Sequence, residues 1–211
     1  MQLDLKGTLR KIVQLLKSND LDTAVCTAAL RALSAFAKIA DCVQPIVAVL
    51  PTIISIFKQT RYSDECRKEG TRLIQALATM ESTQASIFPR LFSALTDEHV
   101  YLRVLGLAVL LEFIRPDTVD SISEHIQTML ALLEDPEQDV RIAAIHNAVA
   151  LRALKPSLKK GAGEFQSTIH TEWCSVVEKL QDPAPRTYLV AWDNMPQLAH
   201  SSACYVMLQD H

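Results

Sequence analysis

Three histidines are the residues best suited to metal chemistry, because imidazole is the commonest metal ligand in proteins. They are His99, His125 and His146, and two of them follow an acidic residue in Glu98-His99 and Glu124-His125. Metal ligands must converge from aligned elements, and these two pairs do not align with each other. The sequence therefore predicts solvated surface positions for the histidines, no metal site and no cofactor.

Nucleophilic and phosphate-binding chemistry also lacks its partner residues. Cys174 stands beside Trp173 without an evident base, and no Gly-x-Ser-x-Gly sequence occurs. The segment Gly161-Ala162-Gly163 lacks the other residues of a phosphate-binding loop. We therefore name no catalytic residue and expect a protein that is not an enzyme.

The most regular charged residues are arginines that follow acidic turns. Arg103 stands six residues after Asp97, Arg141 stands six residues after Asp135, and the two copies are 38 residues apart. A ligand-binding row of arginines, with Arg67 as a third member, is one explanation. The regular spacing favours the other explanation, in which each arginine pairs with a turn aspartate and fixes how copies of a unit stack.

The same period recurs in the prolines and agrees with the composition. Pro51 and Pro89 are also 38 residues apart, and self-similarity at this length is typical of stacked repeats. The 211-residue chain is 49% hydrophobic but only 6% aromatic, and it has five glycines. Long Ala/Leu segments with few glycines favour helices over hairpins. The sequence therefore predicts an all-α chain.

Helical periodicity and turn residues divide the chain into five units. We expect one array over 1–211, with units at about 1–41, 42–80, 82–115, 118–155 and a degenerate C-terminal unit at 164–211. Each of the first four is expected to be a pair of helices. Pro51 should kink the first helix of the second unit, at about 44–58, and Ser18-Asn19-Asp20 should cap the helix that follows it.

These residues resemble HEAT repeats, the helix-pair family allied to armadillo repeats, most strongly over residues 84–154. Pro51 and Pro89, the turn residues Asp97 and Asp135, and the helix openings Leu102-Arg103 and Val140-Arg141 carry the resemblance. It implies a right-handed α-solenoid of about five stacked helix pairs. It also implies a structural ladder of hydrogen bonds between neighbouring repeats, made by Asp97, Arg103, Asp135 and Arg141. The second helices would then line a concave groove.

The predicted partner-binding residues lie on the second helices, aligned through the three arginines. They are Lys68, Arg72, Gln75, Tyr101, Val104, Ala108, Leu111, Ile142, His146 and Val149, and the alignment extends to Thr27, Arg31 and Ser34. This row is basic and polar in its N-terminal half and apolar in its C-terminal half. We therefore expect an acidic-plus-apolar peptide or helix as partner. The alternative is that curvature or neighbouring helices bury Val104 and Leu111.

Charge and hydropathy argue against two other classes of partner. The formal net charge is −3 and the pI is about 6.1, so the chain has no electrostatic signature of nucleic-acid or membrane binding. The longest apolar run, Val104 to Leu111, is far shorter than the ~20 residues that span a bilayer. Five cysteines without a CxxC pair are typical of a reduced intracellular chain. We expect a cytoplasmic or nuclear location.

The resemblance leaves three functions to weigh. A protein-binding scaffold or adaptor, acting alone or within a larger multi-subunit complex, needs only the groove. A HEAT-like nucleic-acid-binding protein or DNA glycosylase would need a basic concave face and a pocket tryptophan, whereas Trp173 and Trp192 lie in the degenerate last unit. A tubulin-binding array would need basic and aromatic turns, whereas Asp97-Glu98 and Asp135-Pro136-Glu137 are acidic. The scaffold is the function that the sequence favours.

Overall fold

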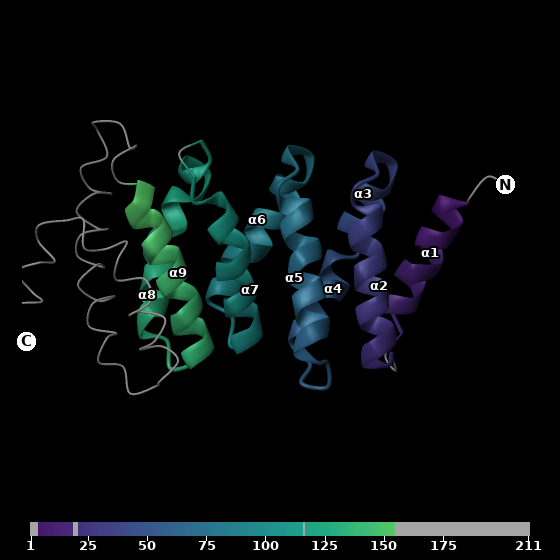
Figure 1. Ribbon diagram of the computed structural model, residues 1–211, viewed down its shortest axis with the longest axis horizontal. Helices are drawn as coiled ribbons and strands as arrows, with labels where there is room; N and C mark the ends of the chain where they lie inside the picture. Colours follow the sequence, from purple (N-terminus) through teal and green to yellow (C-terminus); the bar gives the residue numbers. More distant parts are fainter. Residues whose placement is uncertain (1–3, 19–20, 116, 155–211) are drawn as a thin grey trace, which may run out of the picture. The chain divides into compact units, whose positions relative to one another are not determined.

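The computed structural model describes residues 4–18, 21–115 and 117–154, and every regular element within these ranges is a helix (Figure 1). The predicted fifth unit, 164–211, lies outside the described residues. The α-helices are α1 (Leu5–Leu16), α2 (Thr23–Phe36), α3 (Ala40–Val47), α4 (Leu50–Phe57), α5 (Asp64–Ala78), α6 (Glu81–Leu95), α7 (Val100–Leu110), α8 (Ile126–Ala131) and α9 (Gln138–Leu154), and 3-10 helices are η1 (Leu111–Phe113), η2 (Val119–His125) and η3 (Leu132–Glu134). The all-α prediction is confirmed.

Side-chain caps set where the second helices α2 and α5 begin. The Asp22 carboxylate accepts hydrogen bonds from the backbone N–H groups of Ala24 and Val25, at 2.8 and 3.4 Å. Ser63 Oγ accepts one from the N–H of Cys66 at 3.3 Å. Such caps satisfy N–H groups that have no partner in the first turn. Asp22 therefore caps α2, and the prediction that the segment at 18–20 does so is wrong.

The two prolines that share the 38-residue period have different effects. Pro51 lies in the first turn of α4, where its missing N–H costs no hydrogen bond, and α3 and α4 are bent by 58° at the break before it. Pro89 lies inside α6, which continues from Glu81 to Leu95. The predicted kink is thus a break, and the second repeat has three helices where we expected a pair.

Small residues let the second helices approach the first helices closely. A Cβ atom on Gly70 would stand 3.0 Å from the ring of Phe57 on α4, and one on Gly106 would stand 3.1 Å from the carbonyl oxygen of Leu91 on α6. Gly70 and Gly106 each follow the repeat arginine by three residues. The fully buried Ala144 has the same position on α9. The repeat therefore places a small residue where the second helix packs against the first, in addition to the residues that form its turn.

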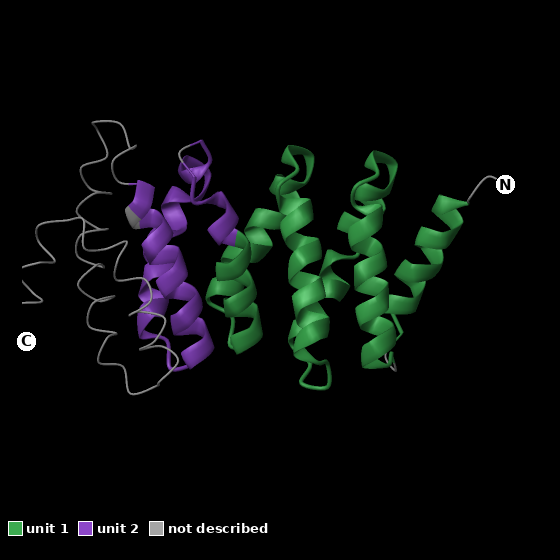
Figure 2. Cartoon of the chain, viewed as in Figure 1, with its two compact units in different colours: residues 1–109 green, residues 110–211 purple. Residues whose placement is uncertain are grey.

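The chain divides into two compact units, Met1–Val109 and Leu110–His211 (Figure 2). In the first unit, α2 and α5 lie side by side, and α5 also packs on α4 and α6. Phe57, Leu30 and Leu73 are among its fully buried side chains. In the described part of the second unit, α9 packs on η3, α8 and η1. The predicted division into five repeats stays a prediction.

The long apolar helices were tested for length and hydropathy. Among the described residues, no single helix is long and apolar enough to cross a bilayer. The bent pair α3 and α4 reaches the required length only when its two halves are counted together. Cys42, Val43 and Ile46 of α3 and Leu50 and Ile53 of α4 are buried. These apolar residues therefore belong to the core of the first unit.

Candidate functional site

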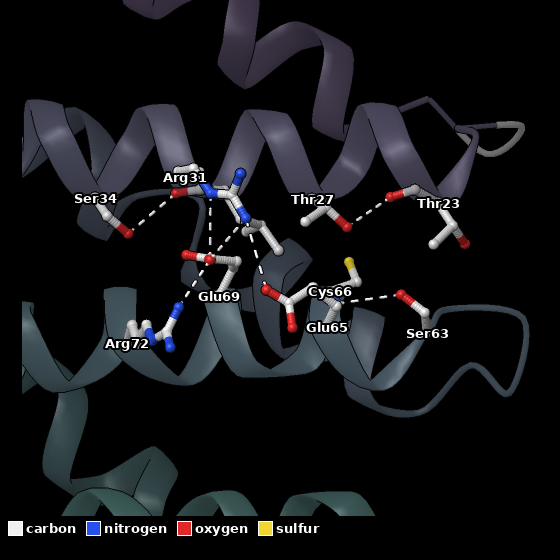
Figure 3. Close-up of polar contacts among 10 residues, drawn as sticks. Thr23, Thr27, Arg31, Ser34, Ser63, Glu65, Cys66, Glu69 and Arg72 are labelled. Atoms are coloured by element: carbon white, nitrogen blue, oxygen red, sulfur yellow. Dashed lines mark hydrogen bonds and ion pairs between the residues drawn. The ribbon is translucent and has the colours of Figure 1, made fainter.

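A buried carboxylate joins α2 to α5. The Glu69 side chain is only 6% exposed, and its Oε1 accepts hydrogen bonds from Arg31 Nε at 3.2 Å and NH2 at 3.0 Å, and from Arg72 NH1 at 2.9 Å (Figure 3). Glu65 adds a longer ion pair with Arg31 at 3.6 Å. A buried charge is stable only when it is paired and hydrogen-bonded, and Glu69 meets both conditions.

Each partner of Glu69 reaches it for a simple geometric reason. Arg72 follows Glu69 by three residues, which places both on one face of α5. Arg31 precedes Glu69 by 38 residues, the repeat period, and comes from the neighbouring helix α2. The acidic residues Asp64 and Glu65 lie in the first turn of α5, where they complement the helix dipole.

The two arginines remain open to solvent although their shared partner is buried. The side chains of Arg31 and Arg72 are 63% and 64% exposed, and Lys68 on α5 is exposed as well. Each guanidinium has five N–H donors, so groups remain available after Glu69 is bound. The result is a surface with fixed guanidinium groups and a net positive charge among Arg31, Lys68, Arg72, Glu65 and Glu69.

On the other side of α5, longer side chains connect it to α7. The guanidinium carbon of Arg67 lies 3.7 Å from the ring centroid of Tyr101, and Arg67 Nε is buried without a hydrogen bond. The other nitrogens of this guanidinium donate to Asp64 Oδ1 at 3.0 Å and to the carbonyl oxygen of Gln59 at 3.1 Å, and the π face of Tyr101 adds a cation–π contact. Gln75 Nε2 donates to the carbonyl oxygen of Ala108 at 3.1 Å. Val104 and Ala108 are half-buried.

The predicted site residues of the first unit lie on α5 and α7, and the structure joins two of them through the hydrogen bond from Gln75 to Ala108. Lys68 and Arg72 are exposed, and Gln75, Tyr101, Val104 and Ala108 are half-buried on the neighbouring helix faces. Residues Leu102, Leu105, Gly106 and Val109 are buried, as expected for the opposite face of α7. We call the surface made by Arg31, Lys68, Arg72, Gln75, Tyr101, Val104 and Ala108 the second-helix face.

Sequence reasoning missed Glu69, the residue that organises this face. A glutamate three residues before an arginine is common on helices, so nothing in α5 alone marks it. The 38-residue separation from Arg31 was the available signal, because equal repeat positions lie side by side. The alignment through the repeat arginines places Arg31 at the position of Arg72 and leaves Glu69 out of the predicted row.

The repeat arginines close the turns of their own repeats. Arg103 NH1 donates to the carbonyl oxygens of Asp97 and Glu98 at 2.8 and 2.9 Å. Arg141 NH1 donates in the same way to the carbonyl oxygens of Asp135 and Pro136, both at 2.9 Å. The spacing of six residues therefore has a local cause. A ladder from these arginines to neighbouring repeats stays a prediction.

Asp97 makes its cross-repeat contact with a lysine, where the ladder led us to expect an arginine. Lys58 Nζ lies 3.0 Å from Asp97 Oδ2, and Asp97 Oδ1 accepts from the backbone N–H of His99 at 3.0 Å and contacts its ring Nδ1 at 2.8 Å. Burial raises the pKa of Asp97, but the hydrogen bonds from His99 and Lys58 outweigh it and lower the pKa to about 2.

Comparison with known proteins adds the fold. No family model matches the sequence, and no curated protein matches it. An engineered protein of known structure matches with a TM-score of 0.56 and 14% identity over 99% of this chain and 87% of its own. A designed armadillo repeat protein matches with a TM-score of 0.54 and 17% identity, over 96% of this chain and 87% of its own. The chain has an armadillo/HEAT-like helical repeat fold.

A second designed armadillo repeat structure agrees. It is a computationally designed armadillo repeat protein for modular peptide recognition, with a TM-score of 0.52 and 14% identity over 90% of this chain and 82% of that one. At these identities the likeness concerns the armadillo/HEAT-like fold alone. Within this fold, α2, α5 and α7 hold successive second-helix positions of the first unit.

The second unit carries the remaining predicted site residues of the repeat fold. Leu111 and Ile142 are half-buried and His146 is exposed. Val149 is buried, with 8% of its surface exposed, so its predicted place on an open surface needs correction. On α9, Ile142 and His146 are therefore open to solvent in part or in full, whereas Val149, one turn further on, packs in the core.

The described helices carry few of the side chains that metal or catalytic chemistry would need in one place. In the ranges that the structure describes, no group of three or more His, Cys, Asp or Glu side chains is placed to hold a metal ion. His99 is engaged with Asp97 in the turn before α7. A small apolar cavity of about 10 Å³, lined by residues that include Ile74 and Leu105, is too small for a substrate. Two open hollows of about 230 and 310 Å³ are lined by residues that include Tyr62 and Met80, respectively. We take the second-helix face as the candidate site because it contains the predicted partner-binding residues of the first unit.

Proposed function

We propose that this protein is a non-enzymatic scaffold or adaptor that binds a segment of another protein along the second-helix face. One observation carries the proposal: Glu69 holds two exposed arginines in place on α2 and α5, and Gln75 of the same helix α5 binds α7, where Val104 and Ala108 are half-buried. A preorganised cation binds a partner at a lower entropic cost than a free side chain does. A designed protein with the same fold was made for modular peptide recognition, which supports this mode of action.

The chemistry of the face specifies the partner. Arg31, Lys68 and Arg72 would contact acidic side chains, since guanidinium groups bind carboxylates in a planar, two-donor geometry. Val104, Ala108 and the ring of Tyr101 would contact apolar side chains. The partner is therefore an acidic stretch joined to an apolar one, presented as a helix or as an extended peptide. Nucleic acid and tubulin remain the alternatives, and the net charge of −3 opposes the first.

The test uses the full chain and synthetic peptides. An array would hold peptides with an acidic half and an apolar half, together with versions in which the acids are replaced by lysines and versions with scrambled order. We expect selective capture of the acidic-plus-apolar peptides. Equal capture of the lysine versions, or of a DNA duplex in a parallel titration, would contradict the proposal.

Variants then assign the binding to this face. Val104→Asp should weaken binding of the selected peptide at least tenfold, because it puts a charge among the apolar contacts, whereas Lys68→Ala should weaken it less than fivefold. Only the Lys68 contribution should fade as salt is raised, since exposed charges are screened. Lys11→Ala, an exposed lysine on α1, is the matched control and should leave binding unchanged. Circular dichroism must show that Val104→Asp is folded.

A further inference from the structure

Two cysteines meet inside the first unit, away from the second-helix face. Cys26 of α2 and Cys66 of α5 have their Sγ atoms 3.3 Å apart, and neither residue is exposed. Both are free thiols. Each lies near the start of its helix, and the N–H of Cys66 is bound to the cap Ser63. Cys42, on α3, is a third buried free thiol and serves below as an internal comparison.

The surroundings of the pair make its two thiols unequal. The hydrogen bond with Cys26 lowers the pKa of Cys66, burial opposes this effect, and Thr27 and Arg67 also lower the pKa, which stands at about 7 as a result. The same contact and burial raise the pKa of Cys26. A position in the first turn also favours the anion through the helix dipole. Near neutral pH, Cys66 is therefore the nucleophile and Cys26 is the proton donor.

We propose that Cys26 and Cys66 form a reversible disulfide that joins α2 to α5 when the chain meets a peroxide oxidant. The proposal rests on the contact between the two sulfur atoms and is independent of the partner-binding function. The geometry needs a shortening of little more than 1 Å to reach the ~2.05 Å of an S–S bond. No other helix has to move between them.

The chemistry balances with hydrogen peroxide as the oxidant. The Cys66 thiolate attacks one peroxide oxygen, an S–O bond forms, the O–O bond breaks, and the departing hydroxide takes a proton to become water. The sulfur of Cys26 then attacks the Cys66 sulfenic acid, forming the S–S bond and breaking the S–O bond. The Cys26 proton and the leaving hydroxide make a second water. Two thiols and one peroxide thus give one disulfide and two waters.

Access is provided by the helix starts. Val25 and Glu65, the residues just before the two cysteines, are exposed, so the helix turns that carry the two cysteines border the solvent. First turns open more readily than helix centres. A small peroxide can reach the pair through such an opening, whereas Cys42 lies in a different helix and has no second thiol at this distance that the structure describes.

The disulfide would lock the two helices that carry Arg31 and Glu69. It closes a loop of about 40 residues, which removes conformational freedom from the unfolded chain. We expect the melting temperature to rise by about 5–10 °C on oxidation and to return when dithiothreitol is added. A crosslink formed only in unfolded chains would not raise the melting temperature in this way.

The experiment maps the crosslink on the whole protein. Reduced protein is treated with a small excess of hydrogen peroxide at pH 7, alkylated in denaturant, digested with trypsin and analysed by mass spectrometry. Peptide 18–31 contains Cys26, peptide 62–67 contains Cys66 and peptide 39–58 contains Cys42. We expect 18–31 and 62–67 to be recovered as one disulfide-linked species that reducing agent separates. Peptide 39–58 should be recovered alkylated.

Matched variants make the outcome decisive. Cys26→Ser should abolish the crosslink and leave Cys66 as a sulfenic or sulfinic acid, and Cys26→Ala serves if the serine variant is unstable. Cys42→Ser should keep the crosslink. The proposal is overturned if Cys26 and Cys66 are alkylated as fully as Cys42 after peroxide treatment. It is also overturned if either one is recovered mainly in a disulfide with a different cysteine.

Discussion

The α2–α5 and α5–α7 contacts show two ways of joining successive repeats within one compact unit. Between α2 and α5, a buried Glu69 binds Arg31 and Arg72, and two thiols touch. Between α5 and α7, the ring of Tyr101 stacks on the guanidinium of Arg67, and the side-chain amide of Gln75 donates a hydrogen bond to the carbonyl oxygen of Ala108. The helices α2 and α5 pack along their length, whereas α7, on the opposite flank of α5 (Figure 1), packs less closely on it.

The difference shows that repeat register does not determine the kind of contact. Both interfaces join second helices of successive repeats, yet charged side chains join α2 to α5, whereas α5 and α7 are joined by long side chains that leave Val104 and Ala108 partly open. A charge pair needs a close and rigid approach, whereas a ring or an amide can bridge a wider one. The wider interface therefore supplies the apolar part of the second-helix face, and the closer one supplies its cations.

The largest expected effect is at Glu69. Glu69→Ala should lower the free energy of unfolding by about 2–3 kcal/mol, because it removes charge-assisted hydrogen bonds and leaves Arg31 and Arg72 repelling each other. Urea unfolding followed by circular dichroism measures the change. The control is Glu65→Ala, whose ion pair with Arg31 is exposed and should contribute less than about 0.5 kcal/mol. Equal losses in the two variants would show that burial of Glu69 has no energetic role.

A smaller effect is expected at Asp97, in the turn that begins the wider interface. Its pKa is about 2 in the folded protein and about 4 when unfolded, so its stabilisation is complete above pH 4 and is lost as the pH falls to 2. Asp97→Asn should therefore cost about 2 kcal/mol at pH 7 and progressively less below pH 4. Urea unfolding over this pH range measures it.

Lys58 supplies a partial control for Asp97. Lys58→Met removes the lysine but keeps the hydrogen bonds from His99, so the pH-dependent difference should shrink without vanishing. The prediction is contradicted if the difference in free energy of unfolding between wild type and Asp97→Asn stays constant from pH 7 to pH 2. The loss would then not come from the ionisation of Asp97.

The smallest effect is expected at the Arg67–Tyr101 stack. Tyr101→Ala should cost about 1–2 kcal/mol, because the cation loses its ring and Arg67 Nε stays without an acceptor. Tyr101→Phe keeps the ring and should cost less than about 0.5 kcal/mol. Thermal unfolding of both variants decides the matter. If the phenylalanine variant is as unstable as the alanine variant, the hydroxyl and not the ring holds this interface.

Much of the fold followed from the sequence because helical periodicity is local. The helix openings expected at Leu102-Arg103 and Val140-Arg141 lie in the first turns of α7 and α9. The break at Pro51 was expected only as a kink, since the same residue type at Pro89 leaves α6 continuous. A proline's effect depends on its distance from the helix start, which periodicity does not specify to one residue.

The site was predicted less completely, because its central contact is tertiary. The outward positions of Lys68, Arg72 and Val104 follow from helix geometry and repeat alignment. Glu69 could not be assigned to the core from α5 alone, since its burial depends on how closely α2 approaches. The thiol contact of Cys26 and Cys66 depends on the same approach. Val149 was misplaced because the packing of α9 decides which side of its last turns is covered.

The cross-repeat contacts of the first unit have a consequence for folding during synthesis. They join Thr23 to Arg61, Arg31 to Glu69 and Gln75 to Ala108, across 38, 38 and 33 residues of sequence. A nascent chain can make each of them as soon as one further repeat has left the ribosome, without waiting for a distant segment. Folding can therefore follow translation repeat by repeat, and an apolar helix waits only for its immediate successor before it is covered.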